Sequence, residues 1–413
     1  MSTASSPPLP ARAAWAMLLA LISGFALSQA FRTVTSIIAT GLQAEFALSP
    51  QQLGTFASLF AFAFGIMQLV MGIALDVFGL RRTVLAAFPF TVAGALLSAW
   101  SKDWSLVLWG QALIGLGCAP AFLVCTVFIA RYFAPHRFAA VSGLALGMGG
   151  LGMVFTGTPL AWVVEHSSWR MGFVVLAVMS VAAWLLIWRY VHEPAEARAA
   201  HPPEPLGQAI RGFGALFLLP HTWGILLLAL VTYASLLTLR GLWLGPLLID
   251  RHGFSLVESG NVALLVSLVA LFSPGLFGRF DPGVHKRRAW MVWGTLIVAA
   301  VFFCMAFATN AWLDVGCALA VSFFSGYGVL QYADVRSAYP AAMTGRAMAV
   351  FTMALFLGAA LMQWVSGLAA SLAKANGGNP YAMVMLTIAG MLVAGALALK
   401  FLPQPDFSSQ NGS

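Results

Sequence analysis

Charged residues are scarce in this sequence. Of its 413 residues only 8% are Asp, Glu, Lys or Arg, whereas 61% are hydrophobic. A water-soluble domain carries about 25% charged residues, because a polar shell must enclose its apolar core. The scarcity therefore excludes a soluble globule, a disordered chain and a nucleic-acid-binding protein. It favours a chain whose main partner is a lipid bilayer.

Cysteine is also rare, and the chain lacks the groupings of residues that carry enzymatic chemistry. The four cysteines all lie inside apolar stretches, where they form neither a disulfide framework nor a zinc-binding spacing: Cys118, Cys125, Cys304 and Cys317. The loops contain no nucleophile paired with a base and no set of metal ligands. We therefore expect neither an enzyme nor a protein with a cofactor or a resident metal.

Long apolar runs fill most of the chain. A helix needs about 20 apolar residues to cross the bilayer core, because each backbone amide there must be bonded within its own segment. Runs of about this length contain no charged residue at 46–75, 83–101, 104–130, 138–164, 171–188, 212–239, 259–278, 289–313, 347–373 and 375–399. Three apolar segments include charge: 13–44, 221–249 and 311–338. Since 212–239 and 221–249 overlap, the sequence predicts twelve spans, and the first is too long for a signal peptide.

The basic residues are unevenly distributed between the two sides of the predicted membrane. With twelve spans, fifteen Lys and Arg residues fall on the side of the chain termini, and four fall on the other side: Lys102, Arg170, Arg251 and Lys374. Cytoplasmic loops carry an excess of Lys and Arg. We therefore expect an inner-membrane (plasma-membrane) protein with both termini in the cytoplasm, and the net charge of +8 follows from this topology.

A polar stretch separates two sets of six spans that resemble each other. Residues 15–32 align with residues 223–240, and both segments have eighteen residues, begin with Trp and end with Arg. Parallel repeats of this kind are typical of transporters with a central site between the halves. We predict an N-terminal tail (1–12), a six-helix bundle (13–191), a cytoplasmic linker (192–220), a second six-helix bundle (221–402) and a C-terminal tail (403–413).

The loop between the second and third predicted spans carries a recognisable pattern. In the run GIALDVFGLRR it places Gly72, Asp76, Gly79, Arg81 and Arg82. The pattern resembles the loop signature of the major facilitator superfamily. Three further stretches agree with the resemblance: RYFAPHRFAAVSG (131–143), SWRMGF (168–173) and GRAMAVF (345–351). The resemblance covers about residues 13–402 and implies an all-α membrane protein with twelve transmembrane helices in two pseudo-symmetric six-helix bundles, which works by alternating access.

The same loop is a candidate gate. The Asp76 carboxylate can pair with Arg81, with Arg82 or with the N-terminus of a neighbouring helix, and the two glycines permit a tight turn and close helix approach. The alternative is that the arginines only anchor the loop, which explains their charge but not the spacing of Asp76. Where the family usually has further arginines this chain has Val77 and Leu80, and the copy of the pattern in the second half, SPGLFGRFDPGVHKRR (273–288), is degenerate. We therefore expect the strength of the gate to differ between the halves.

Two arginines lie inside apolar spans, Arg32 and Arg240. A guanidinium at mid-span costs about 2.5 to 3.5 kcal/mol on the insertion scale and normally faces a cavity. The two arginines end the aligned repeats, so they can approach each other across a central pathway and clamp an anion. The arrangement is similar to that of the organophosphate:phosphate exchangers of the superfamily. The alternative is that each arginine extends to the membrane interface or packs between helices.

Further candidate contacts with a substrate lie on the same set of helices. Tyr233 precedes Arg240 by seven residues, which predicts a shared helix face, and Gln29 lies near Arg32. Gln363 and Trp364 lie mid-span on the eleventh predicted helix. For each of these residues, interhelical hydrogen bonding or packing is an equal alternative.

These patterns favour a secondary transporter of a small organic anion that bears a carboxylate or a phosphate, coupled to a counter-anion or a proton. Proton-coupled drug efflux is the alternative, but Gln111 stands where those transporters carry an arginine. No carboxylate or histidine lies clearly at mid-membrane. A transporter-like sensor and a metal importer, the latter based on the Met67 and Met71 pair, are less favoured. We expect a monomer.

Overall fold

The computed structural model describes residues 11–134, 137–192 and 213–405, without the side chains of five of them, among which is Asp76. These residues form helices and connecting turns. The first bundle contains α1 (Ala11–Thr33), α2 (Thr35–Phe46), α3 (Pro50–Trp100), α4 (Trp104–Cys118), α5 (Ala121–Tyr132), α6 (Phe138–Phe155), α7 (Thr158–His166) and α8 (Trp169–Tyr190). The predicted tails and linker lie mainly outside the described residues.

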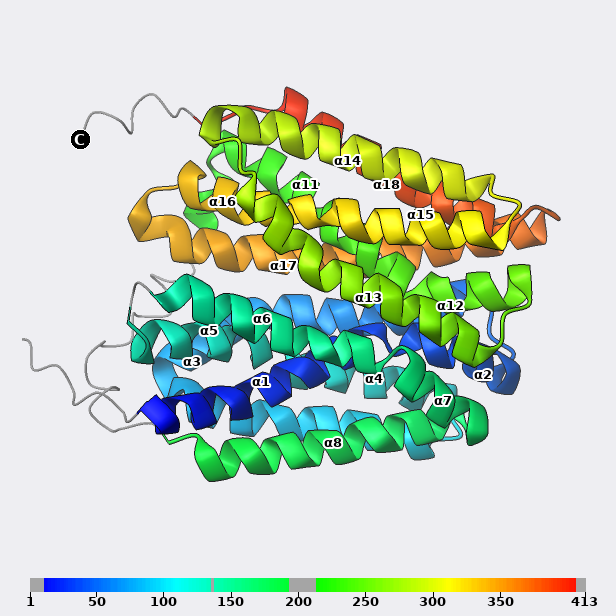
Figure 1. The fold of residues 1–413 in the computed structure, drawn as a ribbon, viewed down its shortest axis with the longest axis horizontal. Helices are drawn as coiled ribbons and strands as arrows, with labels where there is room; N and C mark the ends of the chain where they lie inside the picture. The colour runs from blue at the N-terminus through cyan, green and yellow to red at the C-terminus, as the bar shows by residue number, and fades with distance from the viewer. Residues whose placement is uncertain (1–10, 135–136, 193–212, 406–413) are drawn as a thin grey trace, which may run out of the picture.

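The second bundle begins with span 7, which contains α11 (Pro220–Thr238), η2 (Leu239–Trp243), α12 (Leu244–Pro246) and η3 (Leu247–Arg251). It continues with α13 (Leu256–Arg279), α14 (Val284–Ala306), α15 (Ala311–Phe324), η4 (Ser325–Gly328), α16 (Val329–Ala338), α17 (Ala341–Ala375) and α18 (Pro380–Phe401). The two bundles lie side by side, the first below the second in Figure 1.

Within the described residues, twelve helical segments are long and apolar enough to cross a membrane. The predicted twelve spans are therefore confirmed. The spans do not coincide with the ends of the charge-free runs: the ninth span, for example, ends at Ala306, within the run 289–313. The run from 307 to 310 has no charge, but the Asn310 side chain accepts a hydrogen bond from the Trp312 amide and so starts the next helix.

Several spans contain or end at a break in the helix. The first span ends at Thr33, and α2 follows after Val34, whereas the fifth span changes from α6 to α7 at Thr156 and Gly157. Span 7 contains two π-helical turns, and span 10 contains the 3-10 turn Ser325–Gly328. Irregular backbone at membrane depth is tolerated where protein buries it or where it lines a cavity, and π-turns are frequent at functional sites.

Helix α1 begins and helix α18 ends at the same end of the molecule, at the left of Figure 1. We call this the terminus end, where α1 begins and α18 ends, and we call the opposite end the far end. The long helix α3 starts at the far end, reverses at Gly79 and returns, because Gly79 has φ 79° and ψ 172°. Glycine alone adopts this conformation without strain.

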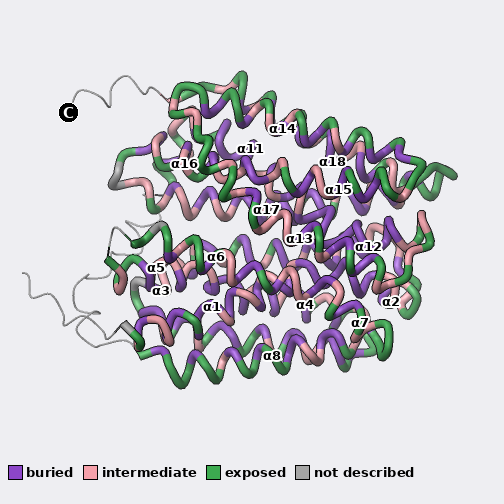
Figure 2. The backbone as a smooth tube through the Cα atoms, in the orientation of Figure 1, coloured by how far each residue is buried: buried purple, intermediate pink, exposed green. Residues whose placement is uncertain are grey.

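The two bundles approach most closely at the far end. If Gly54 of α3 carried a methyl group, that group would lie 2.6 Å from the carbonyl oxygen of Gln363 on α17. A methyl group on Gly245 of α12 would lie 1.9 Å from the carbonyl oxygen of Ser36 on α2. Figure 2 shows the buried stretch around α12, where residues 237–248 are all buried. Toward the terminus end, Gly72 and Gly147 have no such neighbour within 4 Å. The bundles are therefore closed against each other at the far end and further apart at the terminus end.

Candidate functional site

Arg32 lies in the last turn of α1, where a ring of neutral polar groups surrounds its guanidinium. Its Nη1 donates to Gln29 Oε1 at 2.6 Å and to the Tyr233 hydroxyl at 3.4 Å, and its Nη2 donates to Ser28 Oγ at 3.1 Å. Gln29 and Ser28 belong to the preceding turn of the same helix, whereas Tyr233 comes from α11 of the second bundle. The structure thus brings together three of the predicted residues, Arg32, Gln29 and Tyr233.

Two phenylalanine rings complete the surroundings of Arg32. Its guanidinium carbon lies 4.6 Å from the ring centroid of Phe64 on α3 and 4.6 Å from that of Phe356 on α17. Cation–π contacts of this kind stabilise a guanidinium without neutralising its charge. The Tyr233 ring also contacts Phe356, with centroids 5.4 Å apart. Side chains of both bundles therefore enclose Arg32.

Tyr332 of α16 extends this site. It lies within electrostatic range of both Arg32 and Tyr233, and 41% of it is exposed. Sequence reasoning missed Ser28, Phe64 and Phe356, since a serine or phenylalanine in an apolar span has no distinguishing pattern. Ser28 had one available signal, its position one helical turn before Arg32.

The charge of Arg32 is not balanced by a carboxylate among the described residues, and neither is that of Arg240. Four other arginines do have such a partner, in the pairs Arg170–Glu45, Arg251–Asp314, Arg287–Asp281 and Arg288–Asp334. Arg32 Nε and Arg240 Nη1 are both buried and have no hydrogen-bond partner among the described residues. Buried charges in proteins are normally paired, whereas these two cations have no carboxylate counter-ion in the described structure.

Arg240 points to a different part of the interface. It is fully buried, and its Nε donates to the Ala263 carbonyl oxygen at 3.0 Å and to Ser267 Oγ at 2.9 Å. Its Nη2 donates to the Met153 carbonyl oxygen at 3.0 Å and to Thr156 Oγ1 at 3.3 Å. In the described structure the hydrogen bonds of the two guanidinium groups share no partner. The clamp expected from the sequence stays a prediction.

Tyr233 and Arg240 have no hydrogen-bond or ring partner in common in the described structure: Tyr233 contacts Arg32 and Phe356, whereas Arg240 bonds to α13 and to the end of α6. The shared helix face predicted for them stays a prediction. The π-helical turn η2 begins at Leu239, directly before Arg240.

Gln363 and Trp364 lie on α17 and have different surroundings. Gln363 is 2% exposed, and its buried Oε1 has no hydrogen-bond partner among the described residues. Trp364 is 41% exposed. The described contacts join neither side chain to Arg32. Both remain predicted contacts.

The candidate gate lies at the terminus end. Gly79 makes the tight turn expected from the sequence, and Arg81 Nη2 donates to the Trp188 carbonyl oxygen at 3.0 Å, near the end of α8. Gly72 makes no close helix contact in this conformation, contrary to the expectation. Arg82 is exposed. The Asp76 side chain is outside the described part of the structure, so its pairing remains a prediction.

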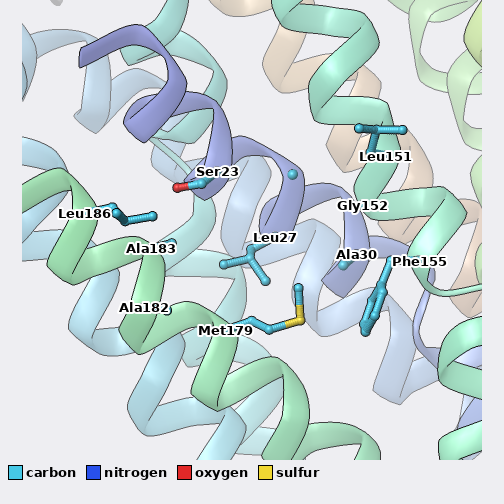
Figure 3. A pocket seen from close by; sticks show the side chains of 11 residues that line it. Ser23, Leu27, Ala30, Leu151, Gly152, Phe155, Met179, Ala182, Ala183 and Leu186 are labelled. Carbon is cyan, nitrogen blue, oxygen red and sulfur yellow. The ribbon is translucent and has the colours of Figure 1, made fainter. Parts of the chain in front are cut away.

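A groove on the outer side of the first bundle does not suit an anion. It lies between α1, α6 and α8, and Figure 3 shows Leu27, Leu151, Phe155 and Met179 among the side chains that line it. Its polar side chain is Ser23, whose hydroxyl donates to the Ala20 carbonyl oxygen. The Arg32 surroundings are therefore the better candidate site for a charged ligand.

The sequence was compared with protein families and with known proteins. A model of the Major Facilitator Superfamily matches residues 20–363. The chain belongs to the Major Facilitator Superfamily. It is accordingly a membrane transporter and not an enzyme, and the family resemblance and fold class inferred from the sequence are confirmed.

Three similar proteins illustrate this membership. The D-galactonate transporter of Escherichia coli O6:H1 (strain CFT073) is 24% identical, with 94% of this chain and 95% of the relative covered. The hexuronate transporter of Bacillus subtilis (strain 168) is also 24% identical, with 62% of each chain covered. Among solved structures, the D-xylose-proton symporter superposes with a TM-score of 0.75 at 17% identity, covering 94% of this chain and 98% of the other. This likeness supports the fold.

Proposed function

We propose that this chain transports a small organic anion by alternating access and that Arg32 binds the anionic group. The observation that supports this most directly is the environment of Arg32. Its guanidinium lies between the two bundles, among neutral polar and aromatic side chains, with no carboxylate partner in the described structure. A carboxylate can accept two parallel N–H bonds from a guanidinium, and it would balance the charge that the protein leaves unbalanced.

The neighbours of Arg32 favour a carboxylate that also carries hydroxyl groups. Gln29, Ser28 and Tyr233 supply an amide and two hydroxyls within 3.4 Å of the guanidinium, and such groups both donate and accept hydrogen bonds. The names of the relatives agree with this chemistry, because galactonate and hexuronates are sugar acids. We therefore propose a sugar-acid-like monocarboxylate as the substrate class, ahead of a phosphate ester.

Arg240 supplies a second positive charge beside the pathway. A methyl group built on its neighbour Gly241 would lie 2.8 Å from the Arg32 carbonyl oxygen, so the helices that carry the two arginines touch at this depth. We propose that Arg240 contributes to anion binding in another conformation of the transport cycle. Gln363 and Trp364 are proposed as further contacts on α17.

The distribution of basic residues supports an orientation in the membrane. In the topology predicted from the sequence, fifteen Lys and Arg residues fall on the side of the chain termini and four on the other side, and positive residues accumulate on the cytoplasmic side. We propose that the terminus end is cytoplasmic and that the protein lies in the inner membrane. In this orientation the observed conformation faces inward, because the bundles are closed at the far end. The loop with Gly72, Asp76, Gly79 and Arg81 is then the cytoplasmic gate.

Counterflow in proteoliposomes tests the substrate proposal. Vesicles loaded with D-galactonate, D-glucuronate, lactate or glycerol 3-phosphate are diluted into a labelled tracer of the same anion. Wild type should exchange at least one sugar acid, and Arg32→Gln should weaken its binding about tenfold or more, because a charge-assisted hydrogen bond contributes about 1.5 to 3 kcal/mol. Arg189→Gln is a matched control, since Arg189 is exposed at the end of α8 and should leave exchange unchanged.

Two outcomes would contradict the proposal. Equal anion exchange in wild type and Arg32→Gln would exclude Arg32 as the binding group. Transport of lipophilic cations against a proton gradient, with no anion exchange, would instead support drug efflux.

A further inference from the structure

The fifth span is broken in the middle of the membrane. Helix α6 ends at Phe155 and α7 begins at Thr158, so Thr156 and Gly157 form a turn between them. The last carbonyl groups of an α-helix have no partner within the helix, and that end carries a partial negative charge. In an apolar environment these carbonyl groups must find donors elsewhere. The break therefore creates an acceptor site at membrane depth.

Arg240 of the second bundle occupies this acceptor site. The carbonyl oxygen of Met153, in the last turn of α6, accepts from Arg240 Nη2 at 3.0 Å and from Ser267 Oγ at 3.3 Å. Thr156 Oγ1, directly after the helix, also accepts from Arg240 Nη2 at 3.3 Å. Figure 1 shows α13, which carries Ser267, lying against the region where α6 meets α7. A cation of one bundle thus binds the C-terminal end of a helix in the other.

The nitrogen atoms of Arg240 divide their bonds between the bundles. Nε binds Ala263 and Ser267 of α13, which belongs to the same bundle as Arg240. Nη2 binds Met153 and Thr156 of the other bundle. A movement of one bundle against the other would therefore break the Nη2 bonds and leave the Nε bonds in place.

The packing around Arg240 indicates which movement of the bundles would break the Nη2 bonds. On the far-end side of the break, a methyl group on Gly157 would lie 2.7 Å from Leu264 Cβ, and one on Gly260 would lie 2.6 Å from Ala161 Cβ. These contacts join α7 to α13, so the far end cannot open until α7 and α13 separate. Opening the far end consequently pulls the end of α6 away from Arg240.

We propose that Arg240 is an inter-bundle latch, which keeps the far end closed in the substrate-free chain by binding the C-terminal end of α6. Release of Nη2 is then a step of far-end opening. The released guanidinium is available to an anion, whose full charge attracts it more strongly than the partial charge of a helix end. The latch follows from the contacts alone, whereas its exchange for an anion rests on the proposed function.

The latch can be tested without a substrate by measuring how often the far end opens. Ser36 of α2 is 1% exposed, and its Oγ accepts a hydrogen bond from the Gly245 amide of the other bundle at 3.1 Å. A Ser36→Cys thiol should react with a charged thiol reagent only when the bundles separate there. Cys304, the exposed native cysteine of the four in the chain, is replaced by Ser in this background. The reaction rate then reports the open population.

Thr156→Val removes a latch acceptor, and Arg240→Gln removes the latch cation. Each should speed labelling of the Ser36→Cys thiol about tenfold, since a hydrogen bond to a charged group contributes about 1.5 to 3 kcal/mol. Thr33→Val is the matched control. The Thr33 hydroxyl is equally buried and lies 2.6 Å from Thr156 Oγ1, but both residues belong to the first bundle, so labelling should keep the wild-type rate.

The result that overturns the latch is an unchanged labelling rate in Thr156→Val. Thr156→Val keeps the buried Arg240 guanidinium and the shape of the threonine side chain. Its folding is checked by monodispersity in detergent, so the test can be read even if Arg240→Gln does not fold. An equal acceleration by Thr33→Val would also overturn the latch, because the effect would then come from the first bundle alone. If the wild type binds no anion but Thr156→Val still speeds labelling, the latch stands and the proposed function fails.

Discussion

The Nη1 atom of Arg32 lies 3.4 Å from the hydroxyl oxygen of Tyr233, and the two residues belong to different bundles. This distance exceeds the usual N–H···O range, in which the heavy atoms are about 2.7 to 3.2 Å apart. The contact is therefore easily exchanged for a stronger acceptor. A carboxylate that arrives between the bundles can bind the guanidinium and accept a hydrogen bond from the tyrosine.

Removing the Tyr233 hydroxyl should weaken anion binding without abolishing it. Tyr233→Phe keeps the ring contact with Phe356, and a neutral hydrogen bond contributes about 0.5 to 1.5 kcal/mol. We expect the Kd of a sugar acid, measured by calorimetry, to rise by about twofold to tenfold. Tyr327→Phe is the control, because its hydroxyl is bonded to Thr295 inside the second bundle. Equal Kd values for Tyr233→Phe and wild type would remove Tyr233 from the site.

Removing one partner of the buried Arg288–Asp334 pair should destabilise the second bundle much more than replacing both partners. Arg288 Nε and Nη2 donate to the two carboxylate oxygens of Asp334 at 3.1 and 2.9 Å, and both residues are at most 5% exposed. Asp334→Asn leaves a buried unpaired cation and should cost about 3 to 5 kcal/mol. The double variant Arg288→Met/Asp334→Leu should recover most of this loss. Thermal unfolding in detergent measures both, and a double variant no more stable than Asp334→Asn contradicts the account.

Asp281 should make stability depend on pH at the terminus end. Hydrogen bonds from Arg287 hold the pKa of Asp281 below its usual value. A carboxyl group whose pKa is lower in the folded chain stabilises it above the unfolded pKa, about 3.9, and this contribution disappears as the pH falls through the folded pKa. The contribution is up to about 1 kcal/mol, because the pair is partly exposed.

The difference in melting temperature between wild type and Asp281→Asn checks this dependence. It should be largest near about pH 7 and should shrink toward about pH 3. A difference that grows as the pH falls would have the wrong sign. Asn310→Ala serves as a control for a loop substitution without a titrating group.

Alanine at two glycines of α3 should have opposite effects on stability. Gly79 has φ 79° and ψ 172°, so Gly79→Ala should destabilise the fold by about 1 to 3 kcal/mol. Gly72 is helical and has open space around it, so Gly72→Ala should stabilise it by about 0.5 to 1 kcal/mol. If the loop is the proposed gate, Gly72→Ala should nevertheless slow transport, because the closed gate requires close helix approach there. Melting temperatures and counterflow rates separate the two effects.

Charge-free runs predicted the twelve spans because each charge in hydrocarbon is costly, whatever the detailed fold. They did not predict the helix breaks, because Val34, Thr156 and the π-turn at Leu239 carry no charge. The glycine-rich run 147–159 was noticeable in the sequence, yet only the structure shows that α6 ends within it.

As with the fold, the sequence predicted part of the candidate site and not the rest. The cost of a guanidinium in a membrane singled out Arg32 and Arg240, and the structure joins Arg32 to the predicted Gln29 and Tyr233. The partners of Arg240 were not predictable, because they lie on α13 and at the break between α6 and α7. Phe64 and Phe356 acquire their role only when the two bundles meet.

The contact between Phe64 of α3 and Phe356 of α17, with ring centroids 4.1 Å apart, lies beside Arg32. Gly54 lies ten residues before Phe64 on α3, about 15 Å away at 1.5 Å per residue, in the closed far end. If the bundles rock about this aromatic contact, a rotation of about 20° separates the far-end helices by about 5 Å over that arm. Atoms near the axis of such a rotation move least. A substrate held at Arg32 would therefore keep its contacts while the pathway closes on one side of the membrane and opens on the other.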